Sequence, residues 1–227
     1  MMSGILAAAA VLGVIVLVVV LLLQRGRDGV DFGAPALLRL YLYIASLAGV
    51  IVFAVGLASV VNYGIARVAG DEFVYGGSVA MARPFPVCPP GAEGCKEPTA
   101  DELARQKDLE RQQRERQRNE DLLRGLTFAT FGAIFWGAHW AARRGLGAEG
   151  RSPGLHRGYL LLGTVVFGVA TIVMLPTGVY QILSNALLTT PEGSYRPGAD
   201  ALGGGLVVTP IWLIYLRLAV TDLRRAA

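Results

Sequence analysis

Five long apolar runs dominate this chain, and each approaches the length that crosses the hydrocarbon core of a membrane. A transmembrane helix needs roughly 20 apolar residues in succession, and hydrophobic residues make up 53% of the 227 positions. No series of alternating ten-residue strands indicates a membrane barrel. The sequence therefore predicts an all-α, multi-pass transmembrane helical bundle with five spans, whose apolar runs lie at about 5–23, 37–65, 126–142, 159–183 and 202–220.

The predicted division of the chain follows these runs. The first run has no basic segment before it and no small-residue cleavage site after it, so we expect a retained helix rather than a secretory signal. We predict an N-terminal membrane anchor helix over 1–24, span two over 37–65, an extracytoplasmic loop over 66–98, a charged helical arm continuing into span three over 99–143, span four over 156–183 and span five over 202–222.

Arginine is concentrated in alternate connections between the runs, and this bias sets the expected orientation. Basic residues near span ends stay on the cytoplasmic side of the membrane. We therefore expect a protein of the bacterial cytoplasmic (inner) membrane, with its N-terminus outside and its C-terminus inside. The arginines that would lie inside are Arg25, Arg27, Arg39, Arg143, Arg144, Arg151, Arg157, Arg217, Arg224 and Arg225.

Both cysteines of the chain, Cys88 and Cys95, lie in the segment PVCPPGAEGCKEP of the predicted outer loop. Disulfides persist in oxidising compartments outside the cytoplasm, so we predict a disulfide that closes a small loop. Two free thiols are the alternative. The cysteine spacing and the lack of other ligands nearby argue against a metal site.

A charged segment over 99–124 precedes span three without a proline or glycine inside it. Thr99 followed by Glu102 fits a capping box. Opposite charges recur four residues apart, which supports a helix that buries little of itself. We predict one helix from about 100 to 143, whose outer part projects about 36 Å at 1.5 Å per residue. The expected pairs are Asp101 with Arg105, Glu110 with Arg114, Arg111 with Glu115 and Arg116 with Glu120.

Two roles are open for this arm. It is either a solvated spacer or a docking surface for another subunit. Because the arm is nearly neutral and lies outside the cell in the predicted topology, we expect no nucleic acid as a partner.

Two parts of the chain are weakly but regularly similar, which indicates an internal repeat. Spans two and three would form one helix pair, and spans four and five a second pair that runs in the same direction. The charged arm is then an insertion in the first pair. The aligned residues include Arg39 with Arg157, Tyr41 with Tyr159, Leu42 with Leu160, Val61 with Val179, Trp136 with Trp212 and His139 with Tyr215.

Three short motifs mark the ends of these spans. Arg-x-Tyr-Leu-Tyr at 39–43 opens span two, Trp-x-x-His-Trp at 136–140 closes span three, and Arg-x-Tyr at 157–159 opens span four. This pattern resembles an uncharacterised family of bacterial integral-membrane proteins, catalogued as a domain of unknown function. The resemblance covers about 38–65 and 126–183. It implies tandem helix pairs and carries no chemistry.

His139 is one of two histidines and lies between Trp136 and Trp140 at the end of span three. In the repeat, Tyr215 takes its place. A tyrosine readily replaces a histidine as an amphipathic anchor at the membrane boundary, but rarely as an imidazole ligand to haem iron. We therefore expect an anchoring or packing role, with a haem or pigment ligand as the alternative.

Two further sets of residues are candidates for contacts. Ala129, Ala133, Gly137 and Ala141 recur every fourth residue on span three, a stripe that lets another helix approach closely. Basic and aromatic residues gather at the predicted inner face, where they suit anionic lipid headgroups and, less well, a quinone headgroup. This predicted rim consists of Arg39, Tyr41, His156, Arg157, Tyr159 and Arg217.

The sequence contains no motif of a known catalytic site, and the interiors of the spans contain no Asp, Glu or Lys. We therefore expect no enzyme, no metal and no resident cofactor. The first hypothesis is a non-catalytic accessory or scaffold subunit of a larger bacterial membrane complex, such as a respiratory or photosynthetic one. Its partners would be other membrane-protein subunits and membrane lipids. The alternatives are a haem- or pigment-binding electron-transfer protein that uses His139, and a channel or carrier for an uncharged solute.

Overall fold

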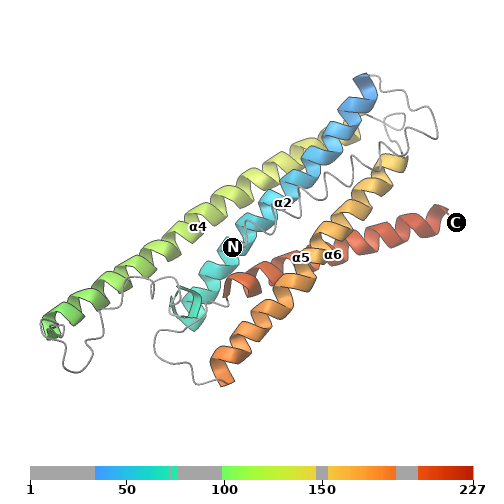
Figure 1. The fold of residues 1–227 in the computed structure, drawn as a ribbon. Coiled ribbons are helices and arrows are strands. Elements are labelled where there is room, and N and C mark those ends of the chain that lie inside the picture. The colour runs from blue at the N-terminus through green and yellow to red at the C-terminus, as the bar shows by residue number, and fades with distance from the viewer. Residues whose placement is uncertain (1–33, 72, 76–98, 147–152, 188–198, 227) are drawn as a thin grey trace, which may run out of the picture.

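The fold is a bundle of long helices, described here from a computed structural model. The part of the chain that the structure describes contains helices and no strand, which confirms the predicted all-α class (Figure 1). The helices are α2 (Ala34–Ala69), α4 (Ala100–Gly145), α5 (Pro153–Leu187) and α6 (Ala199–Ala226). The structure describes residues 34–71, 73–75, 99–146, 153–187 and 199–226.

Some predicted features lie outside the described residues. These are the anchor helix over 1–24, the greater part of the loop over 66–98, and Cys88 and Cys95 with their predicted disulfide. The start of that loop is described, and there the structure differs from the prediction.

Residues 66–71 and 73–75 are helical or tightly turned rather than an open loop. α2 continues to Ala69 and ends at Gly70, whose φ of 96° suits a residue without a side chain. The Gly70 amide donates to the Ala66 carbonyl at 3.0 Å, and the Phe73 amide donates to the Gly70 carbonyl at 3.2 Å. The chain thus turns at once, and this turn brings Tyr75 against α4.

Three helices are long and apolar enough to cross a membrane, so the chain has the character of a membrane protein. They are Leu37–Ala69, Gly154–Ser184 and Asp200–Arg225. The predicted third span, 126–142, forms the apolar half of α4 and is not among them. Its own histidine and two tryptophans lower the hydropathy of this segment, and its passage through the membrane stays a prediction.

The helices pack as two pairs, α2 with α4 and α5 with α6, as the internal repeat predicted. α2 also contacts α6 and, less extensively, α5. The backbone of α4 approaches neither α5 nor α6 closely, although Arg143 of α4 lies over Tyr159 of α5. α2 is therefore the central helix. In Figure 1, α4 and α2 run side by side, while α5 and α6 cross beside them.

Glycines bring α2 and α4 into backbone contact. A side chain at Gly56 would collide with the backbone at Ala129, and one at Gly132 would collide with the backbone of Phe53. A Cβ atom at Gly49 would lie 2.8 Å from the Trp136 amide nitrogen. Such close approach is a common way for membrane helices to gain dispersion contacts without a hydrophobic driving force.

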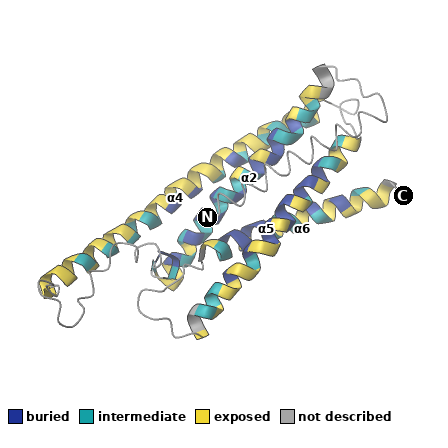
Figure 2. Cartoon of the chain, in the orientation of Figure 1, coloured by how far each residue is buried: buried dark blue, intermediate teal, exposed yellow. Residues whose placement is uncertain are grey.

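The second pair uses the same device. A Cβ atom at Gly178 would lie 2.5 Å from the amide nitrogen of Leu202, and one at Gly168 would lie 2.9 Å from Trp212 Nε1. A tryptophan of the second helix thus faces a glycine of the first helix in both pairs. The centre of the bundle is filled by Phe167 and Val166 of α5, which are almost fully buried. Figure 2 shows this burial along the facing sides of α2, α5 and α6.

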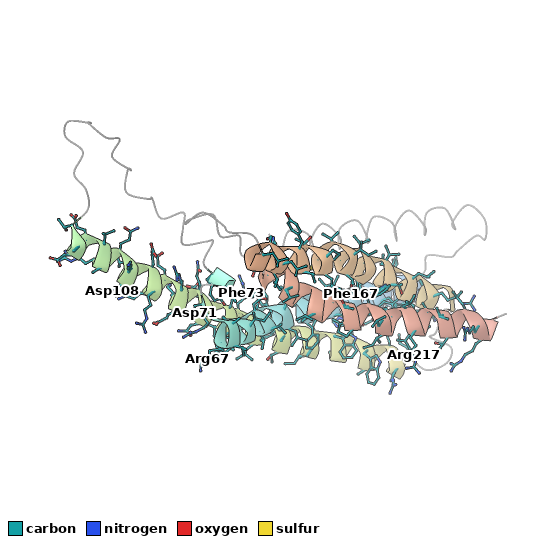
Figure 3. All side chains as sticks on the ribbon, turned by 90° about the horizontal axis from the view of Figure 1, so that it is seen from below. Arg67, Asp71, Phe73, Asp108, Phe167 and Arg217 are labelled. Atoms are coloured by element: carbon teal, nitrogen blue, oxygen red, sulfur yellow. The ribbon has the colours of Figure 1, made fainter. Side chains whose placement is uncertain are left out.

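α4 begins with the predicted capping box. The Glu102 amide donates to Thr99 Oγ1 at 3.3 Å, and the Thr99 amide donates to Glu102 Oε2 at 2.8 Å. The helix then continues without interruption to Gly145, so the charged arm and the apolar segment form one element. In Figure 3 the arm, marked by Asp108, extends beyond Arg67 and Asp71 at the end of α2.

Candidate functional site

The two ends of the bundle differ in charge. One end, here called the basic end, is formed by the N-terminal ends of α2 and α5 and the C-terminal ends of α4 and α6. Its basic residues are Arg39, Arg143, Arg144, Arg157 and Arg217. At the opposite, polar end lie Asn62, Tyr75, Asp121, Arg124 and Asp200. The candidate sites lie at these ends.

Equivalent residues of the repeat form equivalent contacts near the basic end. The hydroxyl groups of Tyr159 and Tyr215 are hydrogen-bonded at 2.6 Å, and His139 Nε2 lies 3.3 Å from the hydroxyl of Tyr41. The ring centroids are 5.6 Å apart in both pairs. The alignment of Tyr41 with Tyr159 and of His139 with Tyr215 therefore corresponds to a shared spatial arrangement.

Both ring nitrogens of His139 have partners. Nδ1 lies 2.7 Å from the carbonyl oxygen of Phe135, which can only accept, so Nδ1 carries the proton. The unprotonated Nε2 then accepts from the hydroxyl of Tyr41. A haem or other metal would have to displace one of these hydrogen bonds, so the contacts favour the anchoring role over the ligand role.

Arg143 is the most constrained cation of the basic end. Its guanidinium carbon lies 4.8 Å from the ring centre of Tyr43 and 4.9 Å from that of Tyr159, which is cation–π geometry. Nη2 donates to the buried hydroxyl of Ser46 at 3.2 Å. The Nε–H is buried and has no acceptor within the described residues, where Arg143 also forms no ion pair.

A pocket of about 340 Å³ opens beside Arg143. It occupies the space between α4 and the α5–α6 pair, whose backbones do not approach closely, and α2 forms its floor. Apart from Arg143 its walls are mainly apolar and aromatic, and they include Val50, Phe53, Trp136, Trp140, Ile211 and Tyr215.

At the polar end, the turn after α2 is held on α4 by two contacts. The hydroxyl of Tyr75 donates to Asp121 Oδ2 at 3.0 Å, and Asp121 also pairs with Arg124. Burial, and then the adjacent Asp121 carboxylate, raise the pKa of the Tyr75 hydroxyl well above its usual value. Arg118 forms a two-oxygen ion pair with Asp71 at 2.9 and 3.2 Å. These contacts fix the base of the arm.

A hydrogen bond joins the two helix pairs at the same end. Asn62 on α2 is buried, and its Nδ2 donates to Asp200 Oδ1 on α6 at 3.0 Å. Gly203 on α6 leaves the space that the Asn62 amide occupies. A second pocket, of about 610 Å³, lies nearby and is lined by Tyr75, Asp121 and Asp200 among others.

The predicted lipid rim does not form one surface. Tyr159 is buried against Tyr215, and its assignment to the rim stays a prediction. Arg157 pairs with Asp222 at 3.1 Å, and Tyr41 bonds to His139. His156 packs on Tyr43 with a ring distance of 6.3 Å and lines the Arg143 pocket. Arg39 and Arg217 lie at the basic end, where Arg217 is exposed.

The predicted small-residue stripe coincides only in part with the contact between α2 and α4. Ala129 lies at the crossing, facing Gly56, but a side chain at Gly137 would meet no atom within 4 Å, and Ala141 is exposed. Ala133 is half-buried. Close approach of another helix to Gly137 and Ala141 stays a prediction.

The roles of four residues could not be predicted from the sequence: Tyr43, Ser46, Asn62 and Asp121. Tyr43 is the last residue of the Arg-x-Tyr-Leu-Tyr motif, which offered a signal. Asn62 and Asp121 are polar residues beside apolar runs, and their partners are distant in sequence. Among the described residues, no group of three or more His, Cys, Asp or Glu side chains is placed to hold a metal ion.

Comparisons with models of protein families, with curated proteins and with solved structures gave no match to this chain.

Proposed function

We propose that this protein is a non-catalytic accessory subunit of a larger bacterial membrane complex, and that the arm of α4 is its docking segment. The observation that supports this most is a helix that is fixed at its base and largely exposed at its tip. Arg118 and Asp121 bind the arm to the turn after α2, whereas most residues from 99 to 113 are exposed.

The arm has the properties of a rigid docking surface. Three of the four predicted charge pairs form, at 3.3, 3.5 and 2.9 Å, but exposed pairs add little stability. Helices in proteins owe most of their stability to packing against other elements. Leu103 and Leu109 are 43% and 58% exposed on this surface, and a partner that covers them would supply that packing.

The apolar half of α4 would be a further span beside α2. Gly125, Ala129 and Trp136 contact α2 between residues 49 and 60, in the middle of the candidate span Leu37–Ala69. A segment paired there would share the membrane depth of α2. The arm would then project from the membrane on the side of the polar end.

The charge of the two ends supports an orientation with the basic end in the cytoplasm. In this orientation the C-terminus lies inside and the arm outside. Green fluorescent protein fused after Ala227 would fluoresce, and alkaline phosphatase fused there would be inactive. The reverse pair of results would contradict the orientation.

The decisive experiment is the particle mass of the protein extracted gently from its native membrane, with and without residues 101–113. We expect a large, defined particle for the full chain and a particle of one or two copies for the deletion. The replacement of Leu103 and Leu109 by alanine should weaken the complex, and Leu123→Ala is the control because Leu123 is exposed on the bundle part of α4. A full-length particle of only one or two copies plus detergent would refute the proposal.

A further inference from the structure

Within the part of the chain that the structure describes, Arg143 has no counter-ion, and its Nε–H has no acceptor. A guanidinium has five N–H donors, and a buried donor of a charged group that stays unpaired is costly. Ser46 accepts from Nη2, but Nε–H is buried without an acceptor, and no carboxylate of the described chain pairs with Arg143. An anionic group from outside the chain would supply the missing counter-charge.

The pocket next to Arg143 is amphipathic along its length. Arg143 and His156 lie at the end nearest the termini of α4 and α5, where the basic end begins. Phe53 and Ile211 line the pocket further along their helices, toward the middle of the candidate spans. A ligand that fits has a negatively charged head and an apolar tail, with the head at the basic end.

We propose that this pocket binds an anionic phospholipid of the surrounding leaflet, independently of the proposed subunit role. Its phosphate group pairs with the Arg143 guanidinium at the pocket wall, and one acyl chain lies on α2 between α4 and α6. A volume of about 340 Å³ is near the lower limit of ligand pockets, about 300 Å³, so it admits one chain and leaves the remainder of the lipid in the bilayer.

Charge complementarity selects an anionic lipid over a zwitterionic one. Arg157 is neutralised by Asp222, whereas Arg143 has no acidic partner in the described part of the chain. Arg144 lies 3.7 Å from the ring centre of Trp140, next to the pocket wall. Arg144 does not line the pocket, so a lipid with net negative charge balances Arg143, and a choline headgroup would add a competing positive charge beside it.

Native mass spectrometry of the full chain in detergent tests the site, with phosphatidylglycerol and phosphatidylcholine of identical acyl chains as probes. We expect the first bound phosphatidylglycerol to appear at a concentration at least tenfold below that of phosphatidylcholine. Arg143→Gln should weaken phosphatidylglycerol about tenfold, the effect of one charge-assisted hydrogen bond. Equal affinity for the two lipids would overturn the proposal.

Two variants separate a specific site from general attraction to a basic surface. Arg144→Gln removes the same charge one residue away and should change the affinity less than threefold; a loss equal to that of Arg143→Gln would overturn the proposal. Ile214→Trp fills the pocket from a position that is 58% exposed, so the bundle stays folded. It should remove the preference for phosphatidylglycerol although all arginines remain, and an unchanged preference would overturn the proposal.

Discussion

The hydroxyl groups of Tyr159 and Tyr215 form a 2.6 Å hydrogen bond in the buried contact between α5 and α6. Tyr41 and His139 form its counterpart between α2 and α4. The two helix pairs therefore share a polar link near the basic end, although one of its four residues has changed from tyrosine to histidine or the reverse. The link is present in both pairs because tyrosine and histidine each offer a ring and a hydrogen-bonding tip.

The Tyr159–Tyr215 bond should contribute measurably to stability. Tyr215→Phe leaves the buried Tyr159 hydroxyl without its partner, and we expect a loss of about 1–2 kcal/mol in the free energy of unfolding. Tyr215→His, which copies the first pair, should lose less. Unfolding in mixed micelles measures both. Equal losses for the two variants would show that the hydrogen bond is unimportant.

The glycine contact between α2 and α4 should not tolerate a methyl group. Gly56→Ala places a Cβ atom against the backbone at Ala129, and we expect a destabilisation of about 1–3 kcal/mol. Gly137→Ala on the same helix pair is the matched control, because its Cβ atom meets nothing within 4 Å. Thermal unfolding in detergent compares the two variants. A tolerated Gly56→Ala would contradict the close approach.

Alkaline pH should weaken the turn after α2 through Tyr75. The native state raises the pKa of this hydroxyl, so it keeps the proton above about pH 10, where the unfolded chain releases it. The stabilisation that the protonated Tyr75 hydroxyl gives the native state is complete below about pH 10. It falls as the pH rises further, by up to about 1.4 kcal/mol per pH unit. Tyr75→Phe should flatten the stability curve between pH 9 and 11. Tyr180→Phe is the control, since Tyr180 is 64% exposed. Parallel curves for Tyr75→Phe and wild type would refute this link.

Asn62 should hold the two helix pairs together at the polar end. Asn62→Ala removes its hydrogen bond to Asp200 and leaves space beside Gly203, and we expect a loss of about 1–3 kcal/mol. Ser59→Ala, one turn away on α2, is the control because Ser59 bonds only within its helix, at 3.4 Å to the Val55 carbonyl. Cysteine cross-linking between α2 and α6 would measure how far these helices separate in each variant. Equal cross-linking in Asn62→Ala and Ser59→Ala would argue against a role of Asn62 in holding the helix pairs together.

The sequence predicted those features that depend on neighbours along the chain. Thr99 and Glu102 are close enough in sequence to specify their capping box, and the charge pairs of the arm repeat with the helical period. The internal repeat predicted the pairing of helices, since copies of one unit tend to pack alike. It also anticipated that Tyr215 corresponds to His139.

The small residues of α4 follow two spacings, one of four residues and one of seven, and the sequence alone did not show which of them marks the contact with α2. Residues spaced by four on α4 suggested a packing stripe, but the contact with α2 uses Gly125 and Gly132 against Gly49 and Gly56. Each of these pairs is seven residues apart in the sequence. Neighbouring antiparallel helices meet again every two turns, so a seven-residue period marks the shared face. Only the crossing of the two helices identifies which period applies.

The sequence by itself determined that this chain is helical, that it has segments long and apolar enough to span a membrane, and that one long charged helix leads into the apolar half of α4. These properties follow from local hydropathy and from residues within a turn or two of each other. Only the tertiary structure decided that Arg143 lies over Tyr43 and Tyr159, that Asn62 meets Asp200, and that a pocket separates α4 from α6. Those relationships join helices far apart in the chain, and they depend on how closely the glycines allow each pair of helices to approach.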